Sequence, residues 1–338
     1  MDSLTHIVLG ACVGELVAGK QLGKRALLFG AAAQSLPDID FVASPFLDAS
    51  SDLIAHRGIT HSWFFVVICT AFLVWASRKL FPKTTMTNKR WAMLWGFEMA
   101  IHLLLDACNV YGTAWWLPFS NERVAFNLLY VADPLFTIVP LIATLLLWWK
   151  RSPEFKRQRW ARISLFVCIG YILVSMGHKH KVDEAVQLAA AEQQIPVKKF
   201  FSTPTPFNIL MYYSLAETDS GYYVNYRSVF DKDQPDPFRF YPKNEPLLQQ
   251  ARNQKEVKNL RLFSQGWYTV EKQNDTLVFN DLRFGQINGW KYRDAGFTFY
   301  YYLDRPDANG LVVQRGRLKN WNGDVVQEYV NRLFGMKK

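Results

Sequence analysis

Histidine and aspartate residues form four short groups within the first 106 residues of the chain. Imidazole and carboxylate groups together are the donors that suit Zn²⁺, Mn²⁺ or Fe²⁺ in proteins. None of the groups contains a cysteine, which argues against a structural zinc site built from thiolates. The seven candidate metal ligands are His6, Asp38, Asp40, His56, His61, His102 and Asp106.

The spacing within two of these groups favours a shared ion. His102 and Asp106 are four residues apart on a predicted helix, so both side chains project from one face. Gly58 permits a tight bend between His56 and His61, two residues that a continuous helix would point apart.

The remaining pair of carboxylates follows a proline. Pro37 makes a regular helix less favourable here, so Asp38 and Asp40 are expected in an extended turn, where one carboxylate can bridge two ions. Each group also has a non-functional explanation: a solvated His6, a turn or helix cap at Asp38 and Asp40, and a buried polar pair between helices at His102. The elements that position the groups decide between these explanations.

Long apolar runs fill residues 1–177 and are missing from residues 178–338. Four of them are candidate membrane helices: Trp63–Ser77, Trp91–Ala107, Asp133–Trp149 and Ile163–Gly177. Two shorter runs precede them, Leu4–Gly19 and Ala26–Leu36, as short spans or a re-entrant pair. The sequence therefore predicts an α-helical membrane bundle of four long and two short helices.

The net charge of +10 is divided equally between the two halves of the chain. In residues 1–177, 14 of the 16 basic residues lie in three alternate connections, around residues 20–25, 78–90 and 150–162. The positive-inside rule makes these connections cytoplasmic, so the charge is an orientation signal and does not indicate a nucleic-acid partner. All four ligand groups then fall at or near the outer face, which favours one common metal site.

Residues 178–338 predict a soluble α+β domain on the outer side. Segments rich in β-branched and aromatic residues, such as Tyr222–Phe230 and Phe297–Leu303, are typical of strands. Val182–Gln194 is predicted to be an amphipathic helix on the membrane surface. The expected domains are thus a membrane-embedded metal-site domain, residues 1–177, and an extracytoplasmic α+β domain, residues 178–338.

Two arginines of the first half stand outside the cytoplasmic loops and among the ligand groups. Arg57 and Arg123 are suited to bidentate recognition of phosphate, with snorkelling or helix-end pairing as the alternative. Thr60 and Ser120 are candidate hydrogen-bond donors to a substrate. Asp133, at the head of an apolar run, is a candidate general base or a residue that supports the metal ligands.

Several motifs occur in an order that resembles the YdjM-like family of membrane-bound metal-dependent hydrolases, from residue 1 to about 177. They are Asp2–His6, Pro37–Asp40, His56–Ser62, His102–Asp106, Pro118–Arg123 and Asp133–Phe136. The resemblance implies a bacterial or archaeal inner-membrane protein with hydrolase activity and the same seven residues around the metal. A more distant similarity is to the zinc-dependent phospholipase C and P1 nuclease group, which builds multi-metal sites from His and Asp on helices.

Together these patterns predict a metal-dependent hydrolase that cleaves a phosphoester of a lipid or lipid-linked substrate at the outer membrane–water interface. Two divalent ions, zinc before manganese or iron, would activate water and stabilise both oxygens of the displacement. One alternative is a zinc amidase of the ceramidase type with a single tetrahedral ion. Another is a non-enzymatic metal-binding or transport protein, for which Glu15 and Glu98 are the acidic residues deep in the apolar runs.

Overall fold

Two packed units make up the chain. The computed structural model of the protein describes residues 1–149, 154–232, 237–292, 294–310, 312, 316–317 and 319–336. Unit 1 comprises Met1–Val42 and Ala55–Val174, and unit 2 comprises Ala43–Ile54 and Ser175–Lys338. The short segment Ala43–Ile54 thus interrupts unit 1 in the sequence and packs in unit 2. The division predicted at residue 177 falls inside one continuous helix.

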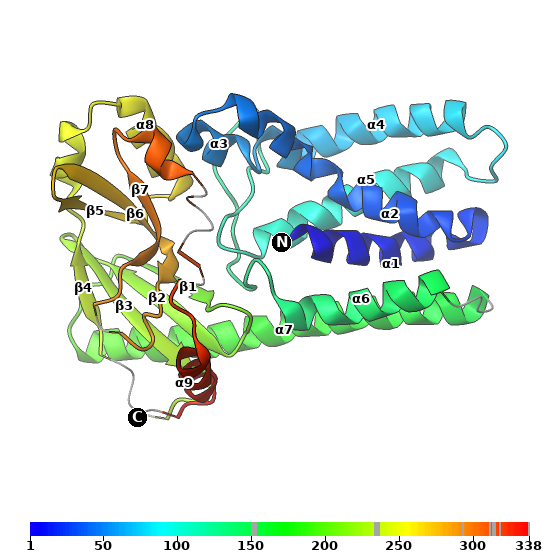
Figure 1. Ribbon diagram of the computed structural model, residues 1–338. Coiled ribbons are helices and arrows are strands. Elements are labelled where there is room, and N and C mark those ends of the chain that lie inside the picture. Colours follow the sequence, from blue (N-terminus) through cyan, green and yellow to red (C-terminus); the bar gives the residue numbers. More distant parts are fainter. Residues whose placement is uncertain are drawn as a thin grey trace. The chain divides into compact units, whose positions relative to one another are not determined.

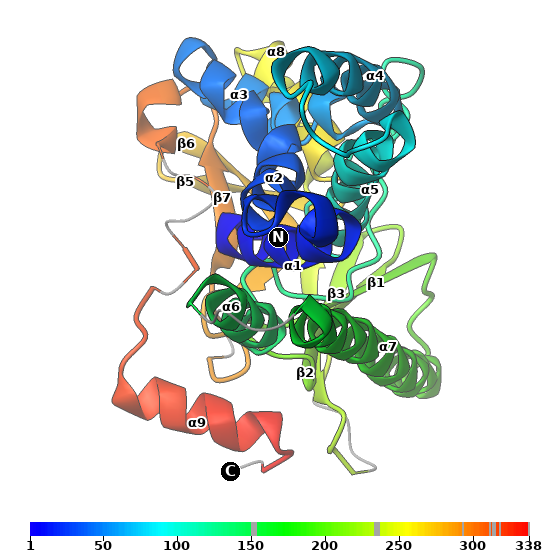
Figure 2. The same cartoon turned by 90° about the vertical axis from the view of Figure 1, so that its right-hand side faces the viewer.

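Unit 1 is a bundle of helices that run side by side (Figure 1, Figure 2). They are α1 (Ser3–Leu22), α2 (Arg25–Ser35), α4 (Trp63–Leu80), α5 (Asn88–Ala107), α6 (Pro134–Trp149) and the first part of α7 (Glu154–Glu192). Side-chain caps define several helix starts, because Asp2, Ser62 and Thr87 each accept a hydrogen bond from a backbone N–H of the first turn. Helix α1 packs against α2, α5 and α6.

Glycines allow α1 and α2 to approach closely. A Cβ atom on Gly30 would lie 2.1 Å from the carbonyl oxygen of Gly10, and one on Gly14 would lie 2.3 Å from the carbonyl oxygen of Ala26. Small residues at such positions let two helix backbones touch, as in membrane helix pairs. This crossing fixes the start of α1, which carries His6, relative to the end of α2, which leads into Asp38.

Two helices among the described residues are long and apolar enough to cross a membrane, α4 and the Arg157–Glu192 part of α7. The sequence predicts four such helices, and the difference lies in α5 and α6. The described part of α6 has 16 residues. Helix α5 has 20 residues, but Lys89, Arg90, Glu98 and Asp106 lower its apolar character. Residues 150–153 of the third predicted basic loop lie outside the described residues.

Short helical segments connect α2 to α4 and carry most of the polar groups. They are η1 (Leu36–Phe46), α3 (Ala49–Ala55) and η2 (Ile59–His61). Asp38 and Asp40 lie on η1, a 3₁₀ helix, and not in the extended turn expected after Pro37. Proline is well tolerated near the first position of a helical segment, because its missing N–H has no partner there in any case.

Segment Ala43–Ile54 is held by α8 (Gln254–Phe263) within unit 2. Lys255 Nζ donates to Asp48 Oδ2 at 3.0 Å, and Asn259 Nδ2 donates to Ser50 Oγ at 3.1 Å. Asp48 also accepts a hydrogen bond from the backbone N–H of Ser51 at 2.9 Å and so caps α3. Two side chains four residues apart on one helix therefore hold the segment that separates Asp40 from His56.

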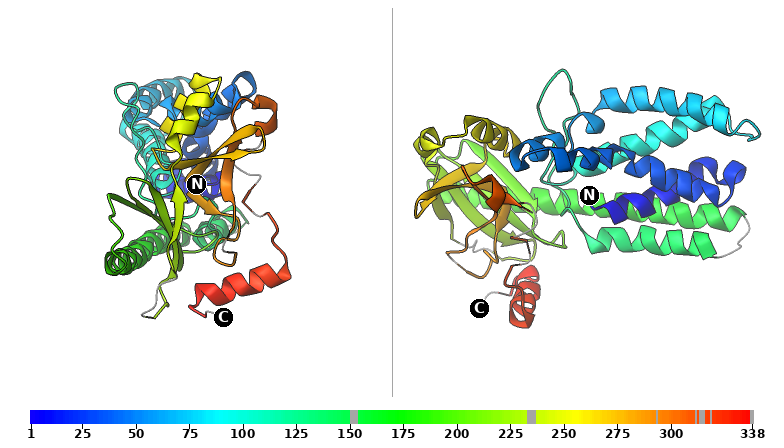
Figure 3. Two further views of the ribbon diagram at one scale, coloured as in Figure 1. Left: turned by 90° about the vertical axis from the view of Figure 1, so that its left-hand side faces the viewer. Right: turned by 45° about the horizontal axis from the view of Figure 1, so that its top comes forward.

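Two antiparallel sheets form the β-structure of unit 2 (Figure 3). The first contains β1 (Lys199–Pro204), β2 (Met211–Glu217), β3 (Gly221–Ser228) and β4 (Arg239–Pro242) in that order. The second contains β5 (Tyr268–Gln273), β6 (Thr276–Gln286) and β7 (Phe297–Tyr302). The remaining segments are η3 (Glu245–Gln250), η4 (Pro306–Asn309) and α9 (Gly323–Leu333). The α+β prediction for this part of the chain is confirmed, with β1, β4 and α9 added.

Helix α7 continues without a break into unit 2. The prediction of a helix over Val182–Gln194 is confirmed as far as Glu192, where it forms the end of the longer α7. Val182 and Val186 are fully buried and pack with Tyr212 and Val229 of unit 2. The apolar face of this stretch therefore covers a protein core.

Candidate metal centre

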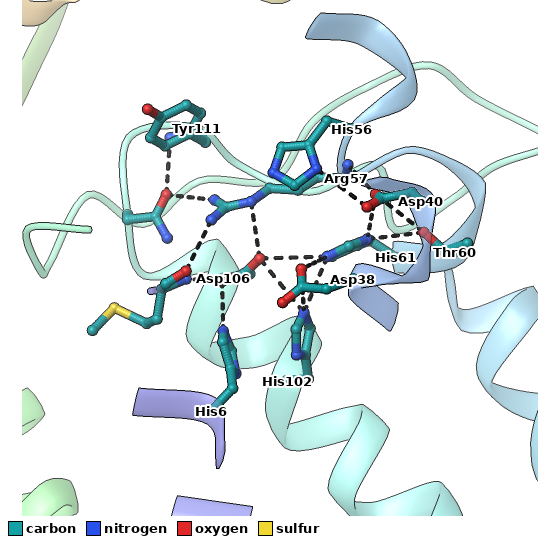
Figure 4. A network of polar contacts seen from close by, with 12 residues as sticks. His6, Asp38, Asp40, His56, Arg57, Thr60, His61, His102, Asp106 and Tyr111 are labelled. Carbon is teal, nitrogen blue, oxygen red and sulfur yellow. Dashed lines mark hydrogen bonds and ion pairs between the residues drawn. The ribbon is translucent and has the colours of Figure 1, made fainter. Parts of the chain in front are cut away.

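Four side chains of unit 1 bring their donor atoms to one point (Figure 4). They are Asp38 from η1, His61 from η2, and His102 and Asp106 from α5. One ligand atom from each lies within 4.8 Å of the others. Both histidines and Asp106 are fully buried, and Asp38 is partly exposed. The His102–Asp106 spacing thus places both side chains on one helix face, and η1 and η2 supply the other two donors.

Most of the distances between these atoms are those of donors around a tetrahedral ion. His61 Nε2 and His102 Nε2 are 3.0 Å apart, and Asp106 Oδ2 lies 3.4 and 3.6 Å from them. Asp38 Oδ1 lies 3.5 and 3.6 Å from the same two nitrogens. Donors bound tetrahedrally at about 2.0–2.2 Å are about 3.3–3.6 Å apart. Four of these five distances have tetrahedral spacing, the two imidazole nitrogens are closer, and the donor set could bind a metal ion.

Each imidazole places its Nε2 atom at this point and contacts a protein group through its other nitrogen. His102 Nδ1 lies 2.5 Å from the carbonyl oxygen of Gln34, which can only accept, so the proton is on Nδ1. His61 Nδ1 lies 3.1 Å from Thr60 Oγ1, and burial lowers the pKa of His61 well below its ordinary value. In the tautomer that carries its proton on Nδ1, each imidazole offers the Nε2 lone pair to a cation at this point. Histidines that bind metals are typically oriented by a hydrogen bond at the ring nitrogen that does not bind the metal.

Asp40 lies behind His61. Its Oδ2 accepts hydrogen bonds from the backbone N–H of Arg57 at 2.8 Å and from Thr60 Oγ1 at 3.3 Å, and it is 3.5 Å from His61 Nδ1. Its Oδ1 is 3.2 Å from Nδ1 of the half-exposed His56. Burial alone would raise the pKa of Asp40, but the His56 hydrogen bond and the other contacts lower it, so the group is a carboxylate. Asp40 and Thr60 thus orient His61, and His56 lies at the outer edge of the network.

The second carboxylate oxygen of Asp106, Oδ1, points away from the four-donor cluster. It is 3.1 Å from His6 Nε2, and the amino nitrogen of Met1 contacts the same oxygen. The His6 ring stacks on the His102 ring with centroids 3.9 Å apart. Within the described part of the chain, His6 Nδ1 has no hydrogen-bond partner. The two oxygens of Asp106 therefore join the cluster to His6.

Arg57 is buried against the same carboxylate. Its Nε lies 2.9 Å from Asp106 Oδ2, its NH1 donates to Asn109 Oδ1 at 2.7 Å, and its guanidinium lies over the Tyr111 ring. Burial lowers the pKa of Arg57 to about 10, which leaves it charged at neutral pH. The backbone here has a positive φ of 58°. The guanidinium and the Met1 amino group both pair with Asp106, and the charges of Asp38 and Asp40 raise the pKa of Arg57 against the effect of burial. A divalent cation at this point would add positive charge beside the three carboxylates.

Three predicted residues have contacts outside the four-donor cluster. Arg123 NH2 donates to the backbone oxygen of His56 at 3.0 Å. Ser120 Oγ accepts from the backbone N–H of Glu122 within its own loop. Asp133 accepts the N–H groups of Leu135 and Phe136 and the Tyr171 hydroxyl, so it caps α6 and ties it to α7. These contacts give Ser120 and Asp133 structural roles.

Two residues that support the site were not predicted. Gln34 is fully buried and binds His102 through its carbonyl oxygen, and its side-chain amide lies 2.7 Å from Glu98 Oε2. Asn109 is fully buried and holds Arg57. The sequence signal for Gln34 was a side-chain amide inside an apolar run. The signal for Asn109 was a side-chain amide three residues after Asp106.

The comparisons with known proteins place the chain in a family. Residues 1–182 match the model of the family described as YdjM inner membrane protein. The chain is 30% identical over 122 residues to "Inner membrane protein YbcI" of Escherichia coli (strain K12), which covers 36% of this chain and 69% of that protein. It is 28% identical over 190 residues to "Uncharacterized protein YfhP" of Bacillus subtilis (strain 168), which covers 52% of this chain and 54% of that protein. No solved structure matches the chain. The chain belongs to the YdjM inner membrane protein family.

Proposed function

We propose that this protein is a metal-dependent hydrolase of the inner membrane that cleaves a phosphoester of a lipid or lipid-linked substrate. The observation that carries the proposal is the convergence of two imidazole nitrogens and two carboxylate oxygens at Asp38, His61, His102 and Asp106. When bound there, divalent ions would acidify a water molecule and polarise a phosphoryl oxygen.

The count of donors bears on whether the centre is catalytic. A single ion with four protein ligands has no position left for water, which is typical of structural zinc. Asp106 supports a second ion, because its other oxygen faces His6 Nε2 at 3.1 Å. Asp40 and His56 form a further carboxylate–imidazole pair at 3.2 Å on the other side of His61. All seven predicted ligands thus lie in one network, of which four form the central cluster.

Arg57 favours an anionic substrate. A guanidinium has five N–H donors, more than the contacts to Asp106, Asn109 and Met1 use. Its charge beside the cluster would hold a phosphoryl group and stabilise negative charge that develops during cleavage. Arg123 extends the positive charge behind His56. An amide substrate has no comparable need for two buried arginines.

The membrane position of the site is also part of the proposal. The basic connections alternate along residues 1–177, which places the ligand groups at the outer face by the positive-inside rule. We therefore expect a multi-pass protein of a bacterial or archaeal inner membrane, with the metal centre and residues 178–338 on the extracytoplasmic side.

A transport role has less support from the contacts of the two buried glutamates. Glu15 is paired with Arg157, with Nε and Oε1 2.9 Å apart. Glu98 accepts a hydrogen bond from the side-chain amide of Gln34 on α2 of the same bundle. Both carboxylates thus hold helices together, which favours a structural role for each of them. Non-enzymatic metal binding and zinc amidase chemistry are the alternatives to be tested.

The test uses full-length protein in nanodiscs, as isolated, after chelation and after readdition of Zn²⁺ or Mn²⁺. We expect metal-dependent cleavage of a short-chain phosphodiester lipid, about two ions per chain, and no cleavage by His102→Ala. His178→Ala is the matched control, because His178 binds the Ile209 carbonyl in unit 2. One bound ion with cleavage of a short-chain N-acyl sphingosine would favour the amidase. Bound metal with neither activity would favour non-enzymatic metal binding.

A further inference from the structure

Six large apolar side chains of unit 1 are exposed around the polar network. They are Ile39 and Phe41 on η1, Ile59 on η2, Phe64 on α4, and Trp116 and Phe119 in the loop after α5. Their exposed fractions lie between 44% and 83%. We call this set the apolar collar. Contiguous exposed apolar surface of this kind marks an interaction site in a folded protein.

The collar residues alternate in the chain with the residues of the metal centre. Ile39 separates Asp38 from Asp40, and Phe41 follows Asp40. The two carboxylates reach His61 and Thr60, whereas Ile39 and Phe41 are 50% and 66% exposed. The same short 3₁₀ helix thus presents its carboxylates to the cluster and its apolar side chains to the surroundings.

Contacts between neighbouring elements connect the four segments that carry the collar. Asp40 Oδ2 accepts from Thr60 Oγ1, which ties η1 to η2 next to Ile59. The backbone N–H of Trp63 donates to the carbonyl oxygen of Trp115 at 3.0 Å, which ties the start of α4 to the loop that carries Trp116. The Phe64 and Phe119 rings meet edge to face at 6.2 Å. The collar residues therefore lie on elements that contact one another, and two of them, Phe64 and Phe119, touch directly.

The apolar collar continues into a helix that is long and apolar enough to cross a membrane. Helix α4 begins at Trp63, directly after η2, and is one of the two candidate spans among the described residues. Its residues Phe64, Val67 and Ile68 are 44–68% exposed, so the helix has an apolar outer face. In a family of inner membrane proteins such a face is suited to lipid, and the collar extends it to the metal centre.

We propose that the apolar collar is immersed in the acyl region of the lipid leaflet beside the metal centre, and that a lipid reaches the cluster from the bilayer along it. Immersion depends only on the exposed side chains and their continuity with α4. The route of the substrate rests in addition on the proposed function. Acyl chains on the collar would place a lipid headgroup at the depth of Asp38, the partly exposed member of the cluster.

The test measures the depth of two collar positions directly. Phe41→Cys and Phe119→Cys are made in a Cys69→Ala background, labelled with a nitroxide and placed in nanodiscs of phosphatidylethanolamine and phosphatidylglycerol. Collisions with oxygen, which concentrates in the bilayer, are compared with collisions with a water-soluble nickel chelate. Val67→Cys on α4 is the lipid reference, and Asp219→Cys, with a side chain 84% exposed in unit 2, is the water reference.

We expect both collar labels to have an oxygen-to-nickel collision ratio close to that of position 67 and well above that of position 219. A ratio like that of position 219 would overturn the proposal, because the collar would then lie in water. Low collision with both reagents would also overturn it, because protein would then cover the collar. Metal content by mass spectrometry shows whether the labelled variants keep the folded centre.

A second measurement separates immersion from the proposed function. Phe119→Asp should raise KM for a phosphodiester lipid embedded in the nanodisc several-fold, with little change for a short-chain soluble analogue and with the metal content unchanged. If the labels report immersion but no lipid is cleaved by any form, the proposed function fails and the immersion stands. If the labels report water but metal-dependent cleavage is found, the collar proposal fails alone.

Discussion

The Nε2 atoms of His61 and His102 lie 3.0 Å apart, although each ring uses its other nitrogen to bind a protein group. With their protons on Nδ1, the two imidazoles offer both Nε2 atoms to a cation. The pair could therefore hold a metal ion together with Asp38 and Asp106, the other two members of the donor set.

Replacing either histidine should remove the central ion. For His61→Ala and His102→Ala we expect at least one metal ion per chain fewer than in the wild type. Each substitution removes one imidazole and leaves a cluster of only three donors. Inductively coupled plasma mass spectrometry of protein purified in detergent measures the content. His178→Ala is the control, and equal metal content in all four proteins would contradict the assignment.

Asp40→Asn should weaken metal binding without abolishing it. Asp40 orients His61 and lies outside the four-donor cluster, and loss of such an orienting group typically lowers metal affinity about 10–100-fold. Competition with a chromogenic chelator measures the change. Asp52→Asn on α3 is the matched control, and an affinity of Asp40→Asn equal to that of the control would show that the contact to His61 is unimportant.

The close contact of α1 with α2 should not tolerate a methyl group. In Gly30→Ala the new Cβ would lie 2.1 Å from the Gly10 carbonyl oxygen, so we expect a loss of about 1–3 kcal/mol in unfolding free energy. Gly170→Ala on α7 is the control, because no atom lies within 4 Å of its Cβ position. Its effect should have the opposite sign and be at most about 1 kcal/mol. Thermal unfolding in detergent compares the two, and similar behaviour would argue against the tight crossing.

The cap of α3 should make stability depend on acidic pH. Burial alone would raise the pKa of Asp48, but hydrogen bonds from Ser50, Ser51 and Lys255 lower it well below its ordinary value. Asp48 therefore stabilises the fold above the unfolded-state pKa of about 4, and this contribution is lost as the pH falls below that value. Asp48→Asn should lower the unfolding temperature at pH 7, and its difference from the wild type should shrink below pH 4. A difference that is constant with pH would show that the Asp48 charge does not contribute.

The placement of His102 and Asp106 on one helix face could be predicted, because it depends only on their spacing in the sequence. His102 and Asp106 share a helix face through a rule of three to four residues per turn, and the structure brings both to the cluster. The support from Gln34 could not be predicted in this way. It depends on how α2 packs against α5, and that packing is set by glycines whose role becomes visible only when the two helices cross.

Two misassignments have a common cause. The number of spanning helices and the membrane-surface helix at Val182–Gln194 both follow from treating apolar residues as contacts with lipid. In the structure α5 buries Glu98 and Asp106 inside the bundle, and Val182 packs against Tyr212 in unit 2. Composition does not distinguish a helix face that meets protein from one that meets lipid.

The position of segment Ala43–Ile54 in unit 2 has a consequence for the order of synthesis. Lys255, which binds Asp48, follows it by 207 residues, so the ribosome completes most of the chain before this partner exists. Until then the stretch between Asp40 and His56 has no α8 to hold it. The segment between η1 and η2 therefore gains its α8 contacts only after most of the chain has been made.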